Sequence, residues 1–296
     1  MSFLTEFPSL SREALRDFKK WIDGGFRDFS RENGEFIESL FDPIKWMLIW
    51  FEKLLVATPW PIIIIVVALL AWLGSRSWKL VVGSVLSFLL IGFFDMWEDT
   101  MATMAMVSVA TLMCIAIGIP IGIAMARSDR LQAIITPILD VMQTIPSFVY
   151  LIPVVMLLGI GKAPALIAVL VYAIPPIVRL TNLGIRLVQE DVLEAADSFG
   201  ASYRQRLFGV QIPLALPNIF AGVNQTIMMA LAMVVIAAMI GAGGLGTPVL
   251  RAISNQYLAL GMLNGIAIVI LAIIFDRVSQ AYGKRLQKHR EGGHGV

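Results

Sequence analysis

The sequence is poor in the residues that build metal, redox and catalytic sites. Its 296 residues include one cysteine, Cys114, and two histidines, His289 and His294. A single cysteine excludes an internal disulfide and a paired-thiol redox centre. Cys114 lies within an apolar run and both histidines lie near the C-terminus. The composition therefore argues against a thiolate or histidine site in the apolar part, and no metal or cofactor is expected on this chain.

Charged residues are scarce as well. Asp, Glu, Lys and Arg make up 15% of the sequence, against about 25% in soluble domains. Hydrophobic residues make up 58%, and the mean hydropathy is +0.80. Several apolar runs exceed the roughly 18 residues that read as membrane-spanning. The sequence therefore predicts an all-α, polytopic membrane helical bundle.

Seven apolar segments are expected to cross the membrane: 59–74, 78–94, 100–126, 132–158, 164–186, 212–242 and 258–279. The stretch 44–57 is a doubtful eighth span because Glu52 and Lys53 interrupt it. Lys and Arg concentrate in alternate loops, whereas the other short loops hold only Lys162 and Arg251. By the positive-inside rule the Lys- and Arg-rich loops are cytoplasmic. The C-terminus is then expected inside and the N-terminus outside.

The region 1–58 is expected to form a tail with two amphipathic helices. The first, in 9–25, has one apolar face and is expected to end at Gly24 and Gly25. The second carries apolar residues at helical spacing from residue 37 to residue 55. Such helices lie in the plane of the membrane interface, and packing against the protein's own bundle is an equal alternative.

Ionisable groups are nearly absent from the predicted spans, which argues against a proton-coupled carrier. Asp140 is the one carboxylate that could lie inside a span, and no in-span Lys, Arg or His is expected beside it. Asp276 is expected to pair with the adjacent Arg277 at the interface. The glycine-rich run 241–246 follows a span rather than a strand, so a turn or close helix approach is expected there. The chain has no GxxxxGK[ST] sequence, so ATP-driven transport would need an ATPase on another polypeptide.

Spans 4 to 6 are unusual in their proline. Each such residue removes a backbone donor; the prolines are Pro137, Pro146, Pro153, Pro175 and Pro176. In hydrocarbon such breaks are tolerated only where protein or a water-filled cavity satisfies the freed groups. Two polar clusters are candidates for lining a translocation path: Gln143, Thr144 and Ser147 around Pro146, and Asn224, Gln225 and Thr226 in the sixth span. Interhelical hydrogen bonding is the commoner role of such residues and stays open.

The longest polar interval between apolar segments begins at Glu190 and ends at Pro217. Glu190 and Asp191 suit a helix N-terminus, apolar residues follow at helical spacing, and Gly200 suits a left-handed C-terminal stop. The pattern predicts a helix of about two to three turns, too short to be stable alone. On pattern alone, an ordinary solvated loop helix and a helix that docks on a partner are equal alternatives.

The spacing of this interval resembles the EAA signature (E-A-A-x3-G-x9-I-x-L-P) of bacterial ABC-importer permeases. The matching residues are Glu194, Ala195, Ala196, Gly200 and Pro213, while Val210 and Ile212 replace the usual Ile and Leu. Further stretches, 140–161, 172–186 and 224–246, resemble the permeases of quaternary-amine importers, the glycine betaine, proline betaine and choline group. The resemblance covers roughly half of the chain.

This resemblance implies a type I ABC importer permease. The permease domain would be 59–283, followed by a cytoplasmic tail, 284–296. Its coupling elbow, at about 190–213, would dock on an ATPase through the five matching residues. The implied partners are two ATPase subunits that bind ATP and Mg, a periplasmic or lipid-anchored substrate-binding protein and a second copy of this chain. The setting would be a bacterial inner membrane with its lipid, and no nucleic acid is expected. An ion-coupled secondary carrier or channel for small amines is the alternative function.

Overall fold

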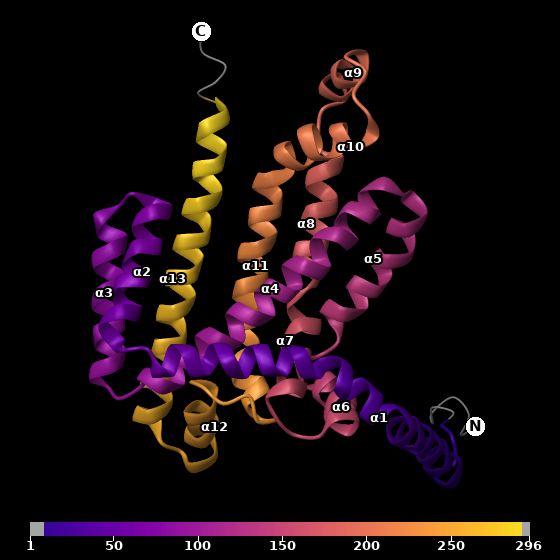
Figure 1. Cartoon of the computed structure of the whole chain (residues 1–296). Helices are drawn as coiled ribbons and strands as arrows, with labels where there is room; N and C mark the ends of the chain where they lie inside the picture. The colour runs from indigo at the N-terminus through magenta and orange to yellow at the C-terminus, as the bar shows by residue number, and fades with distance from the viewer. Residues whose placement is uncertain (1–8, 292–296) are drawn as a thin grey trace, which may run out of the picture.

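The computed structural model describes the backbone of residues 9–291 and the side chains of residues 9–283, and this part of the chain contains helices and no strand. The all-α prediction is confirmed. The helices are α1 (Arg12–Ala57), α2 (Trp60–Ser75), α3 (Trp78–Phe93), α4 (Trp97–Arg127), α5 (Asp129–Thr144), α6 (Ser147–Leu158), α7 (Lys162–Ala173), α8 (Pro175–Arg186), α9 (Glu190–Ser198), α10 (Tyr203–Gln205), the π-helical segment η2 (Arg206–Gln211), α11 (Ile212–Ala238), α12 (Gly246–Asn255) and α13 (Leu258–Glu291) (Figure 1).

Four helical segments are long and apolar enough to cross a membrane on their own: Trp97–Arg127, Lys162–Arg186, Tyr203–Ala238 and Leu258–Gly283. Two sharply bent helix pairs, α1 with α2 and α5 with α6, raise the number to six. The remaining expected span, 78–94, corresponds to α3, a shorter apolar helix of 16 residues. The tail predicted at 284–296 begins inside α13, and its residues 292–296 lie outside the described part, as do residues 1–8.

The N-terminal region is one helix rather than two. α1 runs through Gly24 and Gly25, so the expected stop there is wrong. Glycine costs a helix only about 1 kcal/mol relative to alanine, and the flanking turns keep the hydrogen-bond ladder intact. α1 ends instead at Thr58, whose backbone is extended before Pro59, as steric contact with a proline ring requires. The chain then bends by 108° into α2.

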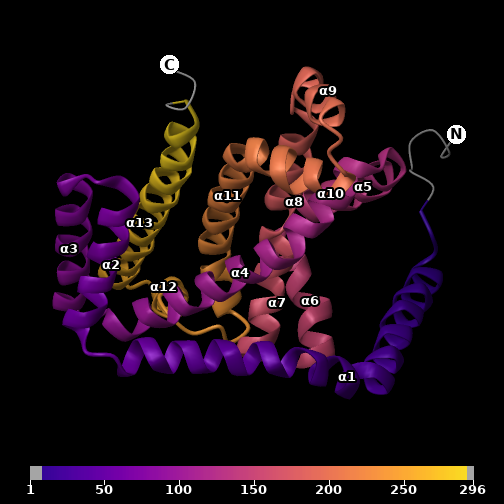
Figure 2. The ribbon, with the colours of Figure 1, turned by 45° about the horizontal axis from the view of Figure 1, so that its top comes forward.

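α1 crosses the end of the bundle that lies opposite α9 (Figure 2). Leu48 is fully buried on its inner side, while Trp46 and Trp50 are 67% and 64% exposed. The stretch 44–57 is therefore part of this crossing helix, up to the bend into α2. α1 thus packs on the bundle along one face, which was one of the two alternatives. The exposed tryptophans on another face suit a membrane interface, and that placement stays a prediction.

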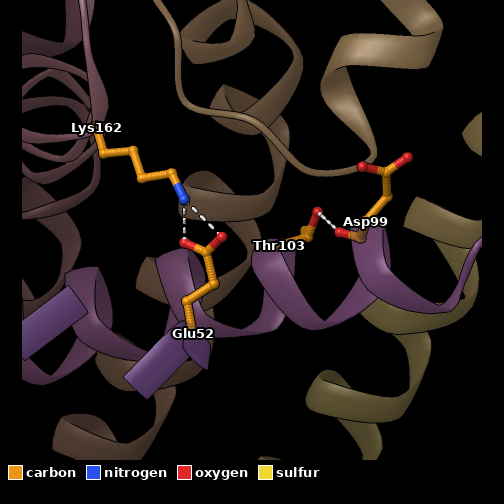
Figure 3. Close-up of polar contacts among 4 residues, drawn as sticks. All are labelled: Glu52, Asp99, Thr103 and Lys162. Carbon is orange, nitrogen blue, oxygen red and sulfur yellow. Dashed lines mark hydrogen bonds and ion pairs between the residues drawn. The ribbon is translucent and has the colours of Figure 1, made fainter. Parts of the chain in front are cut away.

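A salt bridge anchors α1 to the bundle. Lys162 Nζ at the start of α7 lies 2.5 Å from both carboxylate oxygens of Glu52 (Figure 3). Further along α1, the Ser30 hydroxyl donates to the Met156 carbonyl oxygen at 2.8 Å. Glu52, which interrupts the apolar pattern of the sequence, thus attaches α1 to the start of α7.

The predicted span at 132–158 is not one continuous helix but a pair of helices with a sharp break between them. α5 and α6 are separate helices that meet at an angle of 100°. Ile145 is extended before Pro146, which repeats the break seen before Pro59. The proline in the sequence signalled a break, but the hydrophobic run on both sides concealed how large the bend is.

The glycine-rich run after α11 forms a turn, as expected. Gly241, Gly243 and Gly244 have positive φ angles. The Leu245 N–H donates to Thr103 Oγ1 at 2.9 Å, and the same hydroxyl donates to the Asp99 carbonyl oxygen at 2.8 Å (Figure 3). The turn leads into α12, a short helix that the sequence did not predict.

Candidate functional site

α9 is a short helix that begins and ends where the sequence predicted. Glu190 and Asp191 occupy its first turn. Gly200 follows it with φ +74°, and the Ala201 N–H donates to the Ala196 carbonyl oxygen at 3.1 Å. This is the left-handed stop that the sequence predicted, with the wrapped-back hydrogen bond of a Schellman motif. The helix of two to three turns ending at Gly200 is confirmed.

The described part of the chain leaves α9 largely uncovered. It contains no buried residue, and Phe199 at its end is 93% exposed. Figure 1 shows α9 projecting beyond the ends of α8 and α11. Glu194 and Ala195 are exposed, and Ala196 is half-buried. α9 therefore stands outside the bundle, with an exposed aromatic ring at its end.

Polar contacts hold the segment that leads from α9 through α10 and η2 back to α11. Arg206 Nη1 lies 2.7 Å from Asp197 Oδ2 and ties η2 to α9. Ser202 and Gln205 form a reciprocal capping box. The Arg127 guanidinium, at the end of α4, lies 4.1 Å from the centre of the Tyr203 ring. These contacts brace the projecting segment at its base.

Pro213, the last of the five coupling residues, lies in a different element from the other four. It occupies the first turn of α11, directly after the π-helical η2. A proline there cannot donate to the carbonyl four residues earlier, and π-helical turns are rare and often functional. The structure thus places Glu194, Ala195 and Ala196 on α9, Gly200 in the turn, and Pro213 at the start of the helix that re-enters the bundle.

α8 connects α9 to the centre of the bundle and is gripped by glycines. A Cβ atom at Gly122 of α4 would lie 2.6 Å from Thr181 Cβ and 2.7 Å from the Val178 carbonyl oxygen of α8. On the other side, a Cβ at Gly184 would lie 2.7 Å from Asn218 Cβ of α11. Small residues allow helix backbones to approach closely in membranes. α8 is therefore fixed between α4 and α11.

Two ion pairs join α8 to α5. Arg179 Nη2 pairs with Asp140 Oδ1, and Arg186 Nη2 lies 2.7 Å from Asp129 Oδ1. Arg186 also donates to the Met125 carbonyl oxygen at 2.9 Å. The expectation that Asp140 has no basic partner is wrong, because Arg179 lies in the predicted fifth span and reaches it. The two arginines are seven residues apart on α8, so they share a face and hold α5 at two points.

Separate removal of the two charges of the Arg179–Asp140 pair tests this attachment. Arg179→Gln and Asp140→Asn are each expected to lower transport about two- to fivefold, as a partly exposed pair contributes about 0.5–1 kcal/mol. The charge exchange Arg179→Asp with Asp140→Arg is expected to restore most of the loss, and Lys53→Gln serves as the control. Uptake by reconstituted vesicles measures the effect. Single variants with unchanged uptake would show that the pair has no part in transport.

Among the described residues, no group of three His, Cys, Asp or Glu side chains lies close enough to hold a metal ion. The geometry is that of a helical bundle with an exposed, braced segment at one end.

Comparison with known proteins identifies the family. Residues 118–288 match the family described as "binding-protein-dependent transport system inner membrane component". The chain belongs to this family. It is 52% identical over 242 residues to the glycine betaine/proline betaine transport system permease protein ProW of Escherichia coli (strain K12), covering 82% of this chain and 68% of that protein. It is 44% identical over 270 residues to the glycine betaine/carnitine transport permease protein GbuB of Listeria monocytogenes, covering 90% and 94%.

A solved structure of the MetNI methionine ABC transporter in an inward-facing conformation has the same fold. The TM-score is 0.58 at 20% sequence identity, and the match covers 64% of this chain and 95% of the other. The predicted importer-permease fold is confirmed, and the chain is a multi-pass membrane permease.

The two polar clusters of this permease have different surroundings. Gln143 and Thr144 are exposed and Ser147 is half-buried at the break between α5 and α6. On α11, Gln225 is exposed, whereas Thr226 is fully buried and its Oγ1 has no hydrogen-bond partner in the described part. No hydrogen bond in that part links the two clusters. Lining of a translocation path stays a prediction for all six residues.

Asn224 takes part in a contact between helices. Its Nδ2 donates to Asp276 Oδ1 on α13 at 2.8 Å, and its Oδ1 accepts from Ser279 Oγ at 2.5 Å. Asp276 also accepts from Gln280 Nε2 at 2.7 Å. The expected pairing of Asp276 with Arg277 is therefore wrong, because the carboxylate points toward α11. For Asn224 the hydrogen-bonding alternative has direct support.

Arg179 and Asp129 were not among the functional residues expected from the sequence, although a signal was present. On α5 the polar residues Asp129, Gln132, Thr136, Asp140 and Gln143 recur at helical spacing. On α8, Arg179, Asn182 and Arg186 do the same. A polar stripe within an apolar helix indicates a face that meets protein or water rather than lipid.

Proposed function

We propose that this chain is the membrane-spanning permease subunit of an ATP-driven importer of quaternary-amine compatible solutes, of the glycine betaine, proline betaine and choline class. The substrate class is supported by the names of relatives that are 44–52% identical over most of this chain. The single structural observation behind the proposal is α9, which carries Glu194, Ala195 and Ala196, ends at Gly200 and projects with no buried residue.

α9 docks on a separate ATPase subunit that binds ATP and Mg, while this chain binds no cofactor. Two copies of the permease and two ATPases form the transporter, and a periplasmic or lipid-anchored binding protein delivers the substrate. α9 and the C-terminal end of α13 face the cytoplasm, whereas α1 lies on the periplasmic side, and the N-terminus is periplasmic. This orientation is supported by the Lys and Arg of the α2–α3 loop and of α13.

The geometry suggests how motion of the ATPase reaches the membrane. α8 leads directly into α9, is clasped by α4 and α11, and is paired with α5 through Arg179 and Arg186. A displacement of α9 therefore moves α8, and the ion pairs carry α5 with it. Packed helices shift as rigid bodies rather than deform. The break at Pro146 lets α5 turn against α6.

Co-purification followed by reconstitution tests the proposal. The tagged permease is expressed with its native partners, purified from membranes and placed in liposomes with candidate betaines. We expect an ATPase subunit to be recovered and its hydrolysis to rise when a loaded binding protein is added. Recovery of the permease alone, with uptake driven by an ion gradient and no nucleotide, would contradict the proposal and indicate a secondary carrier.

A further inference from the structure

A groove runs between α3 and α13 on the outer side of the bundle. It has a volume of about 410 Å³. Its walls are Leu80, Gly83, Ser84 and Ser87 of α3, and Ile270, Ile273, Ile274 and Arg277 of α13, with Ser77 and Lys79 at one end. On each helix the four wall residues are spaced i, i+3, i+4 and i+7, so one face of each helix lines the groove. α3 and α13 lie on either side of α2 at the edge of the molecule (Figures 1 and 2).

The groove is open because three of its four α3 wall residues, Gly83, Ser84 and Ser87, are small. A Cβ atom at Gly83 would meet no atom within 4 Å. The α13 wall is formed by isoleucines, and Ile273 is 54% exposed. A slot with apolar walls, on helices that contact hydrocarbon, accepts a linear apolar chain.

The end of the groove near the α2–α3 turn is positively charged. Lys79 and Arg277 lie there, and Arg76 occupies the turn. In the described part of the chain, none of these three cations has a hydrogen-bond or ion-pair partner for its side chain. The carboxylate nearest to Arg277 in the sequence, Asp276, is occupied by Asn224 and Gln280. The cations are therefore available to an external anion.

Aromatic rings mark the same level as a membrane interface. The Trp72 and Trp78 rings lie 5.0 Å apart beside the α2–α3 turn, and Trp78 is 68% exposed. Tryptophan is enriched at the depth of the lipid head groups. The cationic end of the groove thus lies at head-group depth, and its apolar walls extend toward the membrane interior.

We propose that this groove binds an anionic phospholipid, with the phosphate at Lys79 and Arg277 and an acyl chain between α3 and α13. Basic pockets between membrane helices are suited to anionic head groups. A zwitterionic lipid carries its own ammonium group and gains less from the two cations. The assignment of this lipid to the cytoplasmic leaflet rests on the orientation given under the proposed function. The existence of the site does not depend on that orientation.

Lipid retention measured by native mass spectrometry tests the site. The full-length permease is released from nanodiscs that contain equal amounts of phosphatidylglycerol and phosphatidylcholine. The wild type is expected to retain phosphatidylglycerol preferentially. In the variant Lys79→Gln/Arg277→Gln, the ratio of retained phosphatidylglycerol to retained phosphatidylcholine is expected to fall about tenfold. Lys19→Gln/Lys20→Gln on α1 is the matched control with the same loss of charge. Glycerol phosphate, which has the anion but no acyl chain, is expected not to compete at millimolar concentration.

A steric variant gives an independent readout. Gly83→Leu is expected to fill the slot and reduce retention of phosphatidylglycerol while both cations remain. Equal retention of the two lipids by the wild type, or unchanged retention in both variants, would overturn the proposal. Displacement of the lipid by glycerol phosphate would indicate a simple anion site and would overturn the proposal. A changed oligomeric state of Gly83→Leu with unchanged retention of phosphatidylglycerol would indicate contact with a second copy and would overturn it as well. ATPase recovery is scored separately, so failure of the lipid site is distinguishable from failure of the proposed function.

Discussion

Replacing Gly200 by valine is expected to abolish substrate uptake while the protein still accumulates in the membrane. Gly200 has φ +74°, a conformation that costs an L-residue about 1–2 kcal/mol and a β-branched residue more. Valine would shift the turn that ends α9 and misplace Phe199 and the helix before it. Because α9 contributes no buried residue to the bundle, the cost should fall on coupling rather than on folding. Uptake, ATPase rate and membrane abundance are measured together.

Asparagine at the same position separates backbone conformation from contact with a partner. Gly200→Asn tolerates the left-handed region and is expected to keep most of the uptake. A Cβ there meets no atom of this chain within 4 Å, so loss of uptake in both variants would point to the partner's surface. Gly25→Val, in a helical stretch of α1 with equally open space, is the control. Full uptake by Gly200→Val would contradict the coupling role of this segment.

Replacing Gly122 by valine is expected to lower the stability of the permease strongly. The first added atom would lie 2.7 Å from the Val178 carbonyl oxygen, and a backbone atom in a clasped helix has no rotamer by which to move away. Overpacking of this kind costs about 1–3 kcal/mol, occasionally more. The loss would separate α4 from α8, the helix that leads to α9.

Thermal stability of the purified protein and its yield from membranes measure this effect. Gly265→Val on α13 is the matched control, since a Cβ at Gly265 meets no atom within 4 Å. Gly122→Ala is expected to fall between the wild type and the valine variant, because it adds the clashing atom without the branch. Equal stability of Gly122→Val and Gly265→Val would rule out close packing of α4 on α8.

Features confined to one turn of the chain were predictable. Two acidic residues at a helix N-terminus and a glycine at its end are local signals, and α9 begins and ends where they indicated. The seven apolar segments likewise correspond to helices, because burial in hydrocarbon requires the backbone to satisfy its own hydrogen bonds. The assignment of Glu194, Ala195, Ala196, Gly200 and Pro213 to an ATPase contact stays a prediction that depends on the partner.

Features that depend on how helices face each other were not predictable in this way. Periodicity reveals that a helix has a polar stripe, but it does not show which neighbour the stripe meets; hence Arg179 was overlooked and Asp276 was assigned to the wrong partner. A proline signals a break and leaves its angle open, so the 100° bend between α5 and α6 came only from the structure.

The sequence alone determined a membrane-embedded helical permease with a short, glycine-terminated segment outside the bundle, because hydrophobicity and helix-end chemistry act over a few residues at a time. The tertiary structure decided the rest: α1 crosses one end of the bundle, α8 is clasped by glycines and tied to α5, and a charged groove opens between α3 and α13. Each of these arises from contacts between residues far apart in the chain, where packing and charge pairing select one arrangement of helices from many that share the same local pattern.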